Sequence, residues 1–137
     1  MVEAPRTAIR LEDRRPLSPH LQIYRRTMTM MMSIAHRISG VALYVGTALV
    51  VWYLVAAASG PDAFNQATRV LGSIPGQIVL FGFTWAWFHH FLGGIRHALW
   101  DTGYGLDAKG REFLAWGTLI GGIALTLAFW LAVYLVR

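Results

Sequence analysis

The chain contains no cysteine and few charged residues. Of its 137 residues, 14% are charged and 55% are hydrophobic, whereas about a quarter of the residues in a soluble domain are charged. The absence of cysteine excludes disulfides, cysteine-ligated zinc, iron–sulfur clusters and haem attached through C-x-x-C-H. Any haem would therefore be bound non-covalently. The low charge argues against a soluble globular protein.

Three uncharged apolar runs account for this composition: Ile38–Ala58, Val70–Ile95 and Phe113–Val136. Each exceeds the roughly 20 residues that a helix needs to span a bilayer. We therefore expect an all-α membrane protein. Its transmembrane helices are predicted at about 28–58, 69–100 and 112–136.

The basic residues are distributed unevenly about these runs. Ten of the twelve lie before the first run or between the second and third, and only Arg69 and Arg137 fall on the other side. This positive-inside bias places the N-terminus and the second loop in the cytoplasm. The net charge of +5 is thus a topology signal and does not indicate nucleic-acid binding.

Residues 1–26 are expected to form a cytoplasmic tail and juxtamembrane segment, and residues 27–137 a three-helix transmembrane anchor domain. Pro16 and Pro19 favour an extended backbone. This segment is expected either to lie across a partner or the membrane surface, or to serve only as a linker. The acidic residues of the tail argue against a mitochondrial transit peptide. A bacterial inner membrane is therefore favoured over a mitochondrial one. Three helices make a thin core, so we expect partner subunits.

The stretch His89–Asp101 closes the second run with three histidines, two glycines, an arginine and an aspartate. Ionisable side chains at bilayer depth indicate a functional site. His90 and His97 share a helix face, and Gly94 beside them leaves space for a flat group such as haem. His89 points about 100° away, so only one of the two histidines can face a given cofactor. We favour His90 as an iron ligand because it shares its face with Gly94 and His97. A second axial ligand must come from another helix, most simply of another chain.

Ser33 and Arg37 lie at i and i+4 near the start of the first helix and share a face. A hydroxyl and a guanidinium there can hydrogen-bond a ligand carbonyl. Alternatively, Ser33 caps the helix and Arg37 extends to lipid phosphates. Asp101 follows His97 by one turn and can orient its ring or pair with Arg96.

Three motifs occur in order with matching topology: Arg-Pro-x-Ser-Pro-His-Leu-x-x-Tyr, Ser-Ile-x-His-Arg-Ile-Ser-Gly and His-x-x-x-Gly-Ile-Arg-His-x-x-x-Asp. From Arg15 onward the chain resembles the cytochrome b membrane-anchor subunits of succinate dehydrogenase. In that family, two small anchors hold haem b between histidines from each. By this resemblance, His90 is an axial ligand of the haem iron.

The resemblance also implies roles for the residues around His90. Ser33 and Arg37 match positions that line the ubiquinone pocket, and His36 and Arg37 match positions near the haem propionates. His97 and Asp101 are assigned to proton supply or to structure. His89 is outside the motif and is expected to serve in packing or at the lipid interface. The role of His20 stays open.

The implied function is electron transfer from succinate to ubiquinone in the tricarboxylic acid cycle and respiratory chain. A flavoprotein subunit with FAD and an iron–sulfur subunit would be the soluble partners, beside a second membrane anchor and the membrane lipids. This chain would bind haem and quinone and carry no catalytic residue. A quinol:fumarate reductase anchor, another b-type cytochrome and a purely structural anchor without haem are the alternatives.

Overall fold

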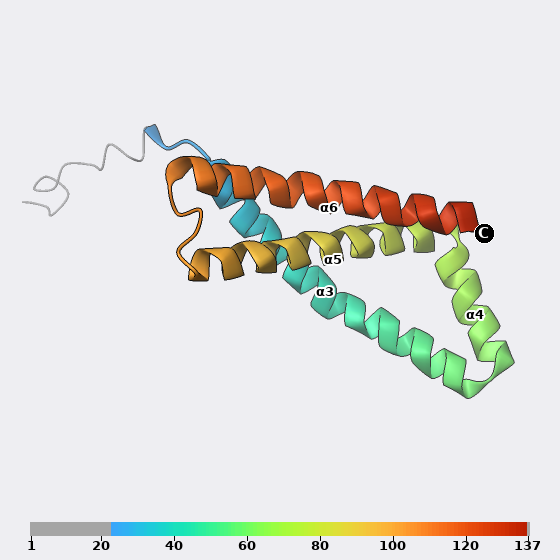
Figure 1. The fold of residues 1–137 in the computed structure, drawn as a ribbon. Coiled ribbons are helices and arrows are strands. Elements are labelled where there is room, and N and C mark those ends of the chain that lie inside the picture. The colour runs from blue at the N-terminus through green and yellow to red at the C-terminus, as the bar shows by residue number, and fades with distance from the viewer. Residues whose placement is uncertain (1–22, 137) are drawn as a thin grey trace, which may run out of the picture.

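The structure is a computed structural model that describes residues 23–136. Within this range the chain forms four helices and no strand: α3 (Met28–Ser59), α4 (Pro61–Gly72), α5 (Ile74–Asp101) and α6 (Ala108–Val136) (Figure 1). By length and composition α3, α5 and α6 can each cross a membrane. The prediction of an all-α membrane protein with three spanning helices is therefore confirmed. Most of the predicted N-terminal tail, including His20, lies outside the described residues.

Local sequence signals determine where these helices begin and end. The Thr27 hydroxyl accepts a hydrogen bond from Met30 N and so caps α3, as threonine does at many N-termini. Gly60 has φ +114° between α3 and α4, a conformation that a side chain would strain. The Ser73 hydroxyl accepts from Gly76 N at the start of α5. The helix cap at α3 is thus Thr27, and the alternative that Ser33 caps it is wrong.

Two of the predicted helix boundaries need correction. The second span was expected to start near residue 69, but α4 continues to Gly72 and α5 begins only at Ile74. The third was expected from residue 112, but α6 begins at Ala108, where the Asp107 carboxylate accepts a hydrogen bond from Gly110 N. Hydropathy marks the apolar part of a helix, whereas capping groups determine its ends.

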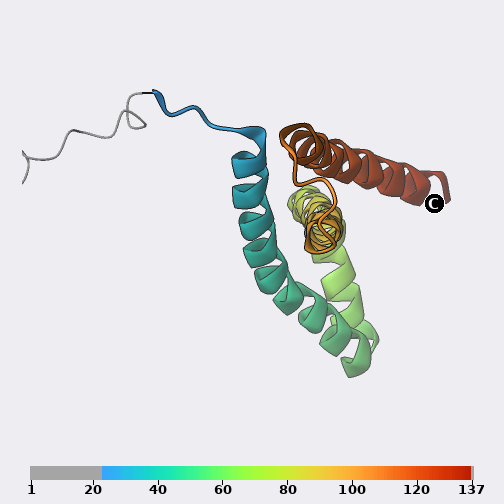
Figure 2. The ribbon, with the colours of Figure 1, turned by 60° about the vertical axis from the view of Figure 1, so that its left-hand side comes forward.

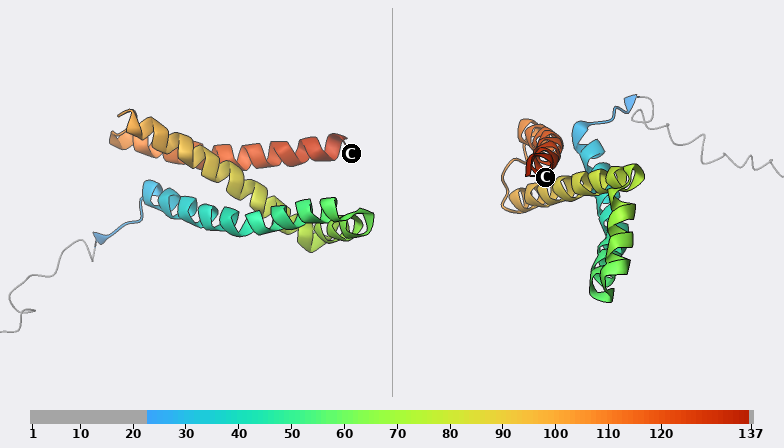
Figure 3. Two further views of the ribbon diagram at one scale, coloured as in Figure 1. Left: turned by 90° about the horizontal axis from the view of Figure 1, so that it is seen from below. Right: turned by 90° about the vertical axis from the view of Figure 1, so that its right-hand side faces the viewer.

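α5 lies between α3 and α6 and contacts both. α5 and α6 run side by side in opposite directions, while α3 crosses α5 obliquely and diverges from it toward α4 (Figures 1 and 2). α4 closes the open end of this wedge, which the views in Figure 3 show from two further directions. The start of α3 and the α5–α6 loop lie at the same end of the molecule, consistent with the topology predicted from charge.

Small residues form the helix contacts. The buried positions of α6 are Ala115, Thr118, Gly122 and Thr126. The two threonine hydroxyls donate to the carbonyls of Leu114 and Gly122, one turn earlier, so their burial leaves no unpaired group. Small residues allow close helix approach within a bilayer, where apolar side chains gain little by avoiding lipid. Large aliphatic side chains accordingly lie on the outer surface.

Candidate functional site

Two histidines from different helices stack where α3 crosses α5. The ring centroids of His36 and His90 are 4.0 Å apart, and the ring planes differ by 7°. Glycines on the opposing helices make room for the rings. A Cβ on Gly40 would lie 3.0 Å from His90 Cε1, and a Cβ on Gly93 would lie 2.3 Å from His36 Nδ1. The sequence thus places a glycine opposite each imidazole.

Hydrogen bonds to α3 determine which nitrogen of His90 carries the proton. His90 Nδ1 is 3.1 Å from the carbonyl oxygen of His36 and 3.2 Å from the hydroxyl of Ser39. The Ser39 hydroxyl itself donates to the same carbonyl at 2.8 Å. Because a carbonyl can only accept, Nδ1 must carry the proton. In neutral His90 the lone pair therefore resides on Nε2.

His97 joins this cluster from the next turns of α5. Its ring centroid is 5.3 Å from that of His36, and it also meets the Trp100 ring edge-on at 5.3 Å. The structure thus brings together three of the predicted residues: His36, His90 and His97. Asp101 is the exposed last residue of α5. Among the described residues it forms neither of the contacts considered from sequence, with His97 or with Arg96.

Ser33 and Arg37 lie on α3 just before and after His36. Ser33 is half-buried and Arg37 is exposed. Both are near the end of the molecule where the α5–α6 loop also lies. Their side chains are therefore available to a ligand or a neighbouring subunit. Arg37 directly follows His36 of the histidine cluster in the sequence.

Ser39 is a site residue to which the sequence analysis assigned no role. It is 1% exposed and contacts both His36 and His90. The available signal was its position three residues after His36, which places both on one side of a helix. Nothing in the sequence, however, indicated that this side would face α5.

His89 lies on the other side of α5 and is completely buried. Its ring stacks on Trp85 at 5.0 Å, and a Cβ built on Gly122 of α6 would lie 3.3 Å from His89 Cα. His89 therefore packs between helices, as one of the two expectations had it. The other expectation, a position at the lipid interface, is wrong. The helical argument that His89 and His90 face different surroundings agrees with the structure.

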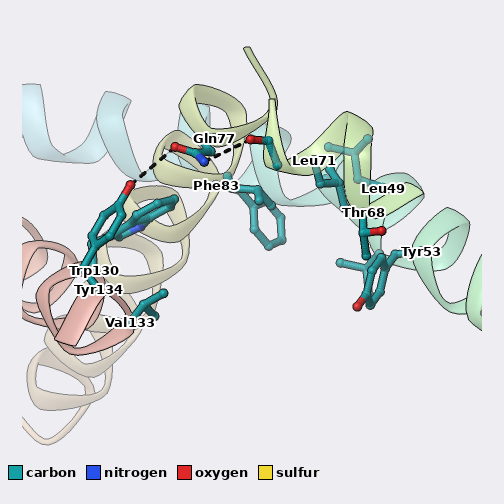
Figure 4. Close-up of a pocket in the computed structure, with 13 residues that line it drawn as sticks. Leu49, Tyr53, Thr68, Leu71, Gln77, Phe83, Trp130, Val133 and Tyr134 are labelled. Atoms are coloured by element: carbon teal, nitrogen blue, oxygen red, sulfur yellow. Dashed lines mark hydrogen bonds between the residues drawn. The ribbon is translucent and has the colours of Figure 1, made fainter. Parts of the chain in front are cut away.

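A separate cavity of about 480 Å³ lies at the opposite end of the molecule, in the wedge that α4 closes. Its lining is mostly apolar, from Leu49 on α3 to Val133 on α6 (Figure 4). Gln77 donates to the carbonyl of Gly72 at 3.1 Å and accepts from the Tyr134 hydroxyl at 3.4 Å. None of the residues predicted from sequence to bind haem or quinone lines this cavity.

Comparison with known proteins identifies the class. Residues 12–133 match the model of the family described as succinate dehydrogenase/fumarate reductase transmembrane subunit. The chain belongs to this family of membrane anchors, as its motifs had suggested.

Individual relatives agree with this assignment. The chain is 42% identical to the succinate dehydrogenase cytochrome b556 subunit of Paracoccus denitrificans over 113 residues, covering 82% of this chain and 87% of the relative. It is 33% identical to that of Rickettsia felis over 125 residues, covering 91% and 98%. The mitochondrial cytochrome b560 subunit of Sus scrofa is 39% identical over 101 residues, 70% of this chain and 58% of the relative.

The term cytochrome b in these names implies haem b, and the residues of the histidine cluster fit one side of such a group. Nδ1 of His90 donates to a backbone carbonyl, which leaves Nε2 as the nitrogen that can bind iron. Gly94, one turn further along α5, is exposed, and a Cβ there would meet no atom within 4 Å. The described residues contain no group of three or more metal-binding side chains.

Proposed function

We propose that this chain is the cytochrome b anchor of a succinate dehydrogenase in a bacterial inner membrane. With a second small anchor subunit it binds haem b and forms part of the site where quinone is reduced. The observation that carries this proposal is the pair of contacts at His90 Nδ1. They leave Nε2 as the acceptor nitrogen in a family whose relatives are named cytochromes b.

Haem b would supply a one-electron redox centre beside the quinone site. His90 would hold the iron from one side through Nε2, with Ser39 and the His36 carbonyl fixing the plane of its ring. The second anchor would provide another ligand. His36 and Arg37, at the start of α3, are suited to pair with the two propionates because both side chains present N–H donors.

Quinone reduction requires polar side chains that hydrogen-bond to an otherwise apolar molecule. The hydroxyl of Ser33 and the guanidinium of Arg37 would donate hydrogen bonds to a ubiquinone carbonyl and stabilise negative charge that develops on its oxygen. His97 and Asp101, near the same end of the molecule, would hold protons available for the reduced oxygens or support the helix end. No residue of this chain is assigned to succinate oxidation.

FAD and the iron–sulfur clusters belong, in this proposal, to a flavoprotein subunit and an iron–sulfur subunit at the cytoplasmic face. Succinate oxidation is preferred over fumarate reduction because the three relatives compared are all named succinate dehydrogenase subunits.

Purification of the complex through a tag on this chain tests the proposal. Copurification of a flavoprotein, an iron–sulfur protein and a second small membrane protein is expected, with reduction of ubiquinone by succinate and a b-type haem spectrum. Copurification of the soluble subunits without any haem band would contradict the proposal that this chain is a cytochrome and would favour a purely structural anchor. Turnover only from quinol to fumarate would reverse the assigned direction.

A further inference from the structure

Arg96 is a buried cation without a counter-ion in the described part of the chain. Its side chain is 2% exposed, and Nε and Nη1 are enclosed without a hydrogen-bond acceptor. The guanidinium carbon lies 5.1 Å from the centre of the Trp100 ring, and the indole N–H of Trp100 is also enclosed without an acceptor. Two guanidinium nitrogens and one indole nitrogen are therefore each enclosed without an acceptor, and leaving the buried guanidinium so is costly unless an anion pairs with it.

The position of Arg96 along α5 indicates where such an anion would come from. Arg96 precedes the end of α5 by five residues, or about 7.5 Å at 1.5 Å per residue. The basic residues of the sequence assign this end to the cytoplasmic side. The guanidinium is thus near the depth at which phospholipid phosphates lie.

A small cavity adjoins Arg96 in the seam between α5 and α6. Its volume is about 140 Å³, and apart from Arg96 and Thr118 its lining is apolar, with Leu92, Ile95, Leu99, Phe113, Leu114 and Gly117. The hydroxyl of Thr118 is already engaged with the Leu114 carbonyl. The cavity therefore places the guanidinium of Arg96 among apolar side chains that suit a hydrocarbon chain.

The other charged side chains near this end of the seam are exposed. Lys109 of α6 is exposed and precedes Phe113 and Gly117 by one and two turns, so it lies on the side of α6 that lines the cavity. Three carboxylates, Asp101, Asp107 and Glu112, are also at this end and are exposed. None of them hydrogen-bonds to the enclosed nitrogens of Arg96.

We propose that the α5–α6 seam is a phospholipid site, in which Arg96 binds the phosphate and the apolar cavity residues hold the start of an acyl chain. A phosphodiester offers several acceptors to a guanidinium. Basic pockets between helices on the cytoplasmic side of a membrane bind lipid head groups in this way. Arg96 lies about 120° around α5 from His90, and the proposed lipid site is separate from the proposed haem and quinone roles.

The test uses the complete complex, purified in detergent, washed exhaustively and assayed for retained phospholipid by mass spectrometry. Arg96→Met removes the charge while keeping an unbranched side chain. Gly117→Leu fills the cavity, where a Cβ meets no atom within 4 Å, and leaves Arg96 itself unchanged. Both variants are expected to retain one phospholipid fewer per copy of this chain than the wild type. Arg69→Met, an exposed arginine on α4, is the matched control and is expected to retain the full number.

A second experiment distinguishes the contribution of the lipid phosphate from that of the acyl chains. The washed wild-type complex is expected to gain thermal stability from phosphatidylglycerol, but not from diacylglycerol, which lacks the phosphate, or from inorganic phosphate, which lacks the chains. Arg96→Met should lose this response. Stabilisation of the wild type by either partial probe would overturn the proposal.

Equal lipid retention in the wild type and in both variants would also refute the site. If Arg96→Met lost its haem band with lipid retention unchanged, the counter-ion would be a propionate and the proposal would be wrong. Should Arg96→Met fail to assemble, Gly117→Leu tests the same site by steric exclusion, and unchanged retention in that variant would contradict it.

Discussion

Two adjacent histidines have different surroundings in this chain. His90 faces α3, where a carbonyl and a hydroxyl hold its ring, whereas His89 is enclosed against Trp85 and Gly122. The 100° step of a helix predicted that only one of them could face a cofactor. It could not predict the stacking of His36 on His90, because that contact depends on how α3 crosses α5.

Gly93→Ala is expected to disrupt the histidine cluster. A Cβ there would come within 2.3 Å of His36 Nδ1, so His36 must move away from its stacked position. Overpacking of this kind costs about 1–3 kcal/mol. The melting temperature and haem content of the purified complex should both fall. Gly82→Ala, where a Cβ meets no atom within 4 Å, is the control and should change neither.

Removal of the proposed quinone donors should lower quinone reduction, and for Arg37, which is also proposed to pair with a haem propionate, the haem spectrum should change as well. Ser33→Ala removes a hydrogen-bond donor and Arg37→Gln removes the positive charge of one, and a hydrogen bond to a charged group contributes about 1.5 kcal/mol or more, roughly a tenfold change. Succinate:ubiquinone activity is expected to fall by about that factor, mainly through a lower kcat, because the donors are proposed to stabilise charge that develops during reduction.

The soluble dye assay and Arg26→Gln are the controls for this experiment. Electron transfer from succinate to a soluble dye bypasses the quinone site and should stay at the wild-type rate. Arg26 is exposed and precedes α3, so its loss should leave both assays unchanged. Equal loss of dye and quinone reduction in the Ser33 and Arg37 variants would indicate impaired assembly and contradict the assigned role.

At the scale of single elements, the connection between the first two spans differs most from expectation. The sequence analysis predicted a helix from about residue 69, but the structure has the 12-residue helix α4 and a break at Ser73 before α5. Pro61 at the first turn and Asp62 beside it are ordinary helix-start signals. They lie outside the apolar runs, and hydropathy alone therefore overlooked them.

Gly60→Ala tests the turn that directs α4 back toward α5. Gly60 has φ +114° and no atom within 4 Å of a built Cβ, so the substitution adds backbone strain without a clash. Strain of this kind costs about 1–3 kcal/mol, and the complex should melt at a lower temperature. Gly72→Ala, at the helical end of α4 with equally free space, should have no destabilising effect.

At the scale of the whole molecule, the fold class could be predicted because three apolar runs of spanning length leave few alternatives. The site could be predicted only in part. His90, His36 and His97 come together within one chain, but in the proposed function the second haem ligand and the remainder of the quinone site would come from partner subunits. Only 11% to 17% of each spanning window is buried within the chain.

This low burial predicts dependence on the second anchor. Exposed side chains of α3 such as Val41 and Tyr44, 65% and 82% exposed, are available for helix packing as well as for lipid. Deletion of the second anchor should markedly reduce the amount of this chain in the membrane, and re-expression of that anchor should restore it. Immunoblots of membranes, with an unrelated inner-membrane protein as the reference, measure this. Unchanged abundance would contradict the dependence.

The central claim is that His90 holds haem iron, and the reduced-minus-oxidised absorption spectrum of the purified complex tests it most directly. The wild type should show a b-type band. His90→Leu should remove or shift that band while the subunits still copurify, and His89→Leu should keep it in whatever complex assembles. A b-type band unchanged in an intact His90→Leu complex would contradict the assignment.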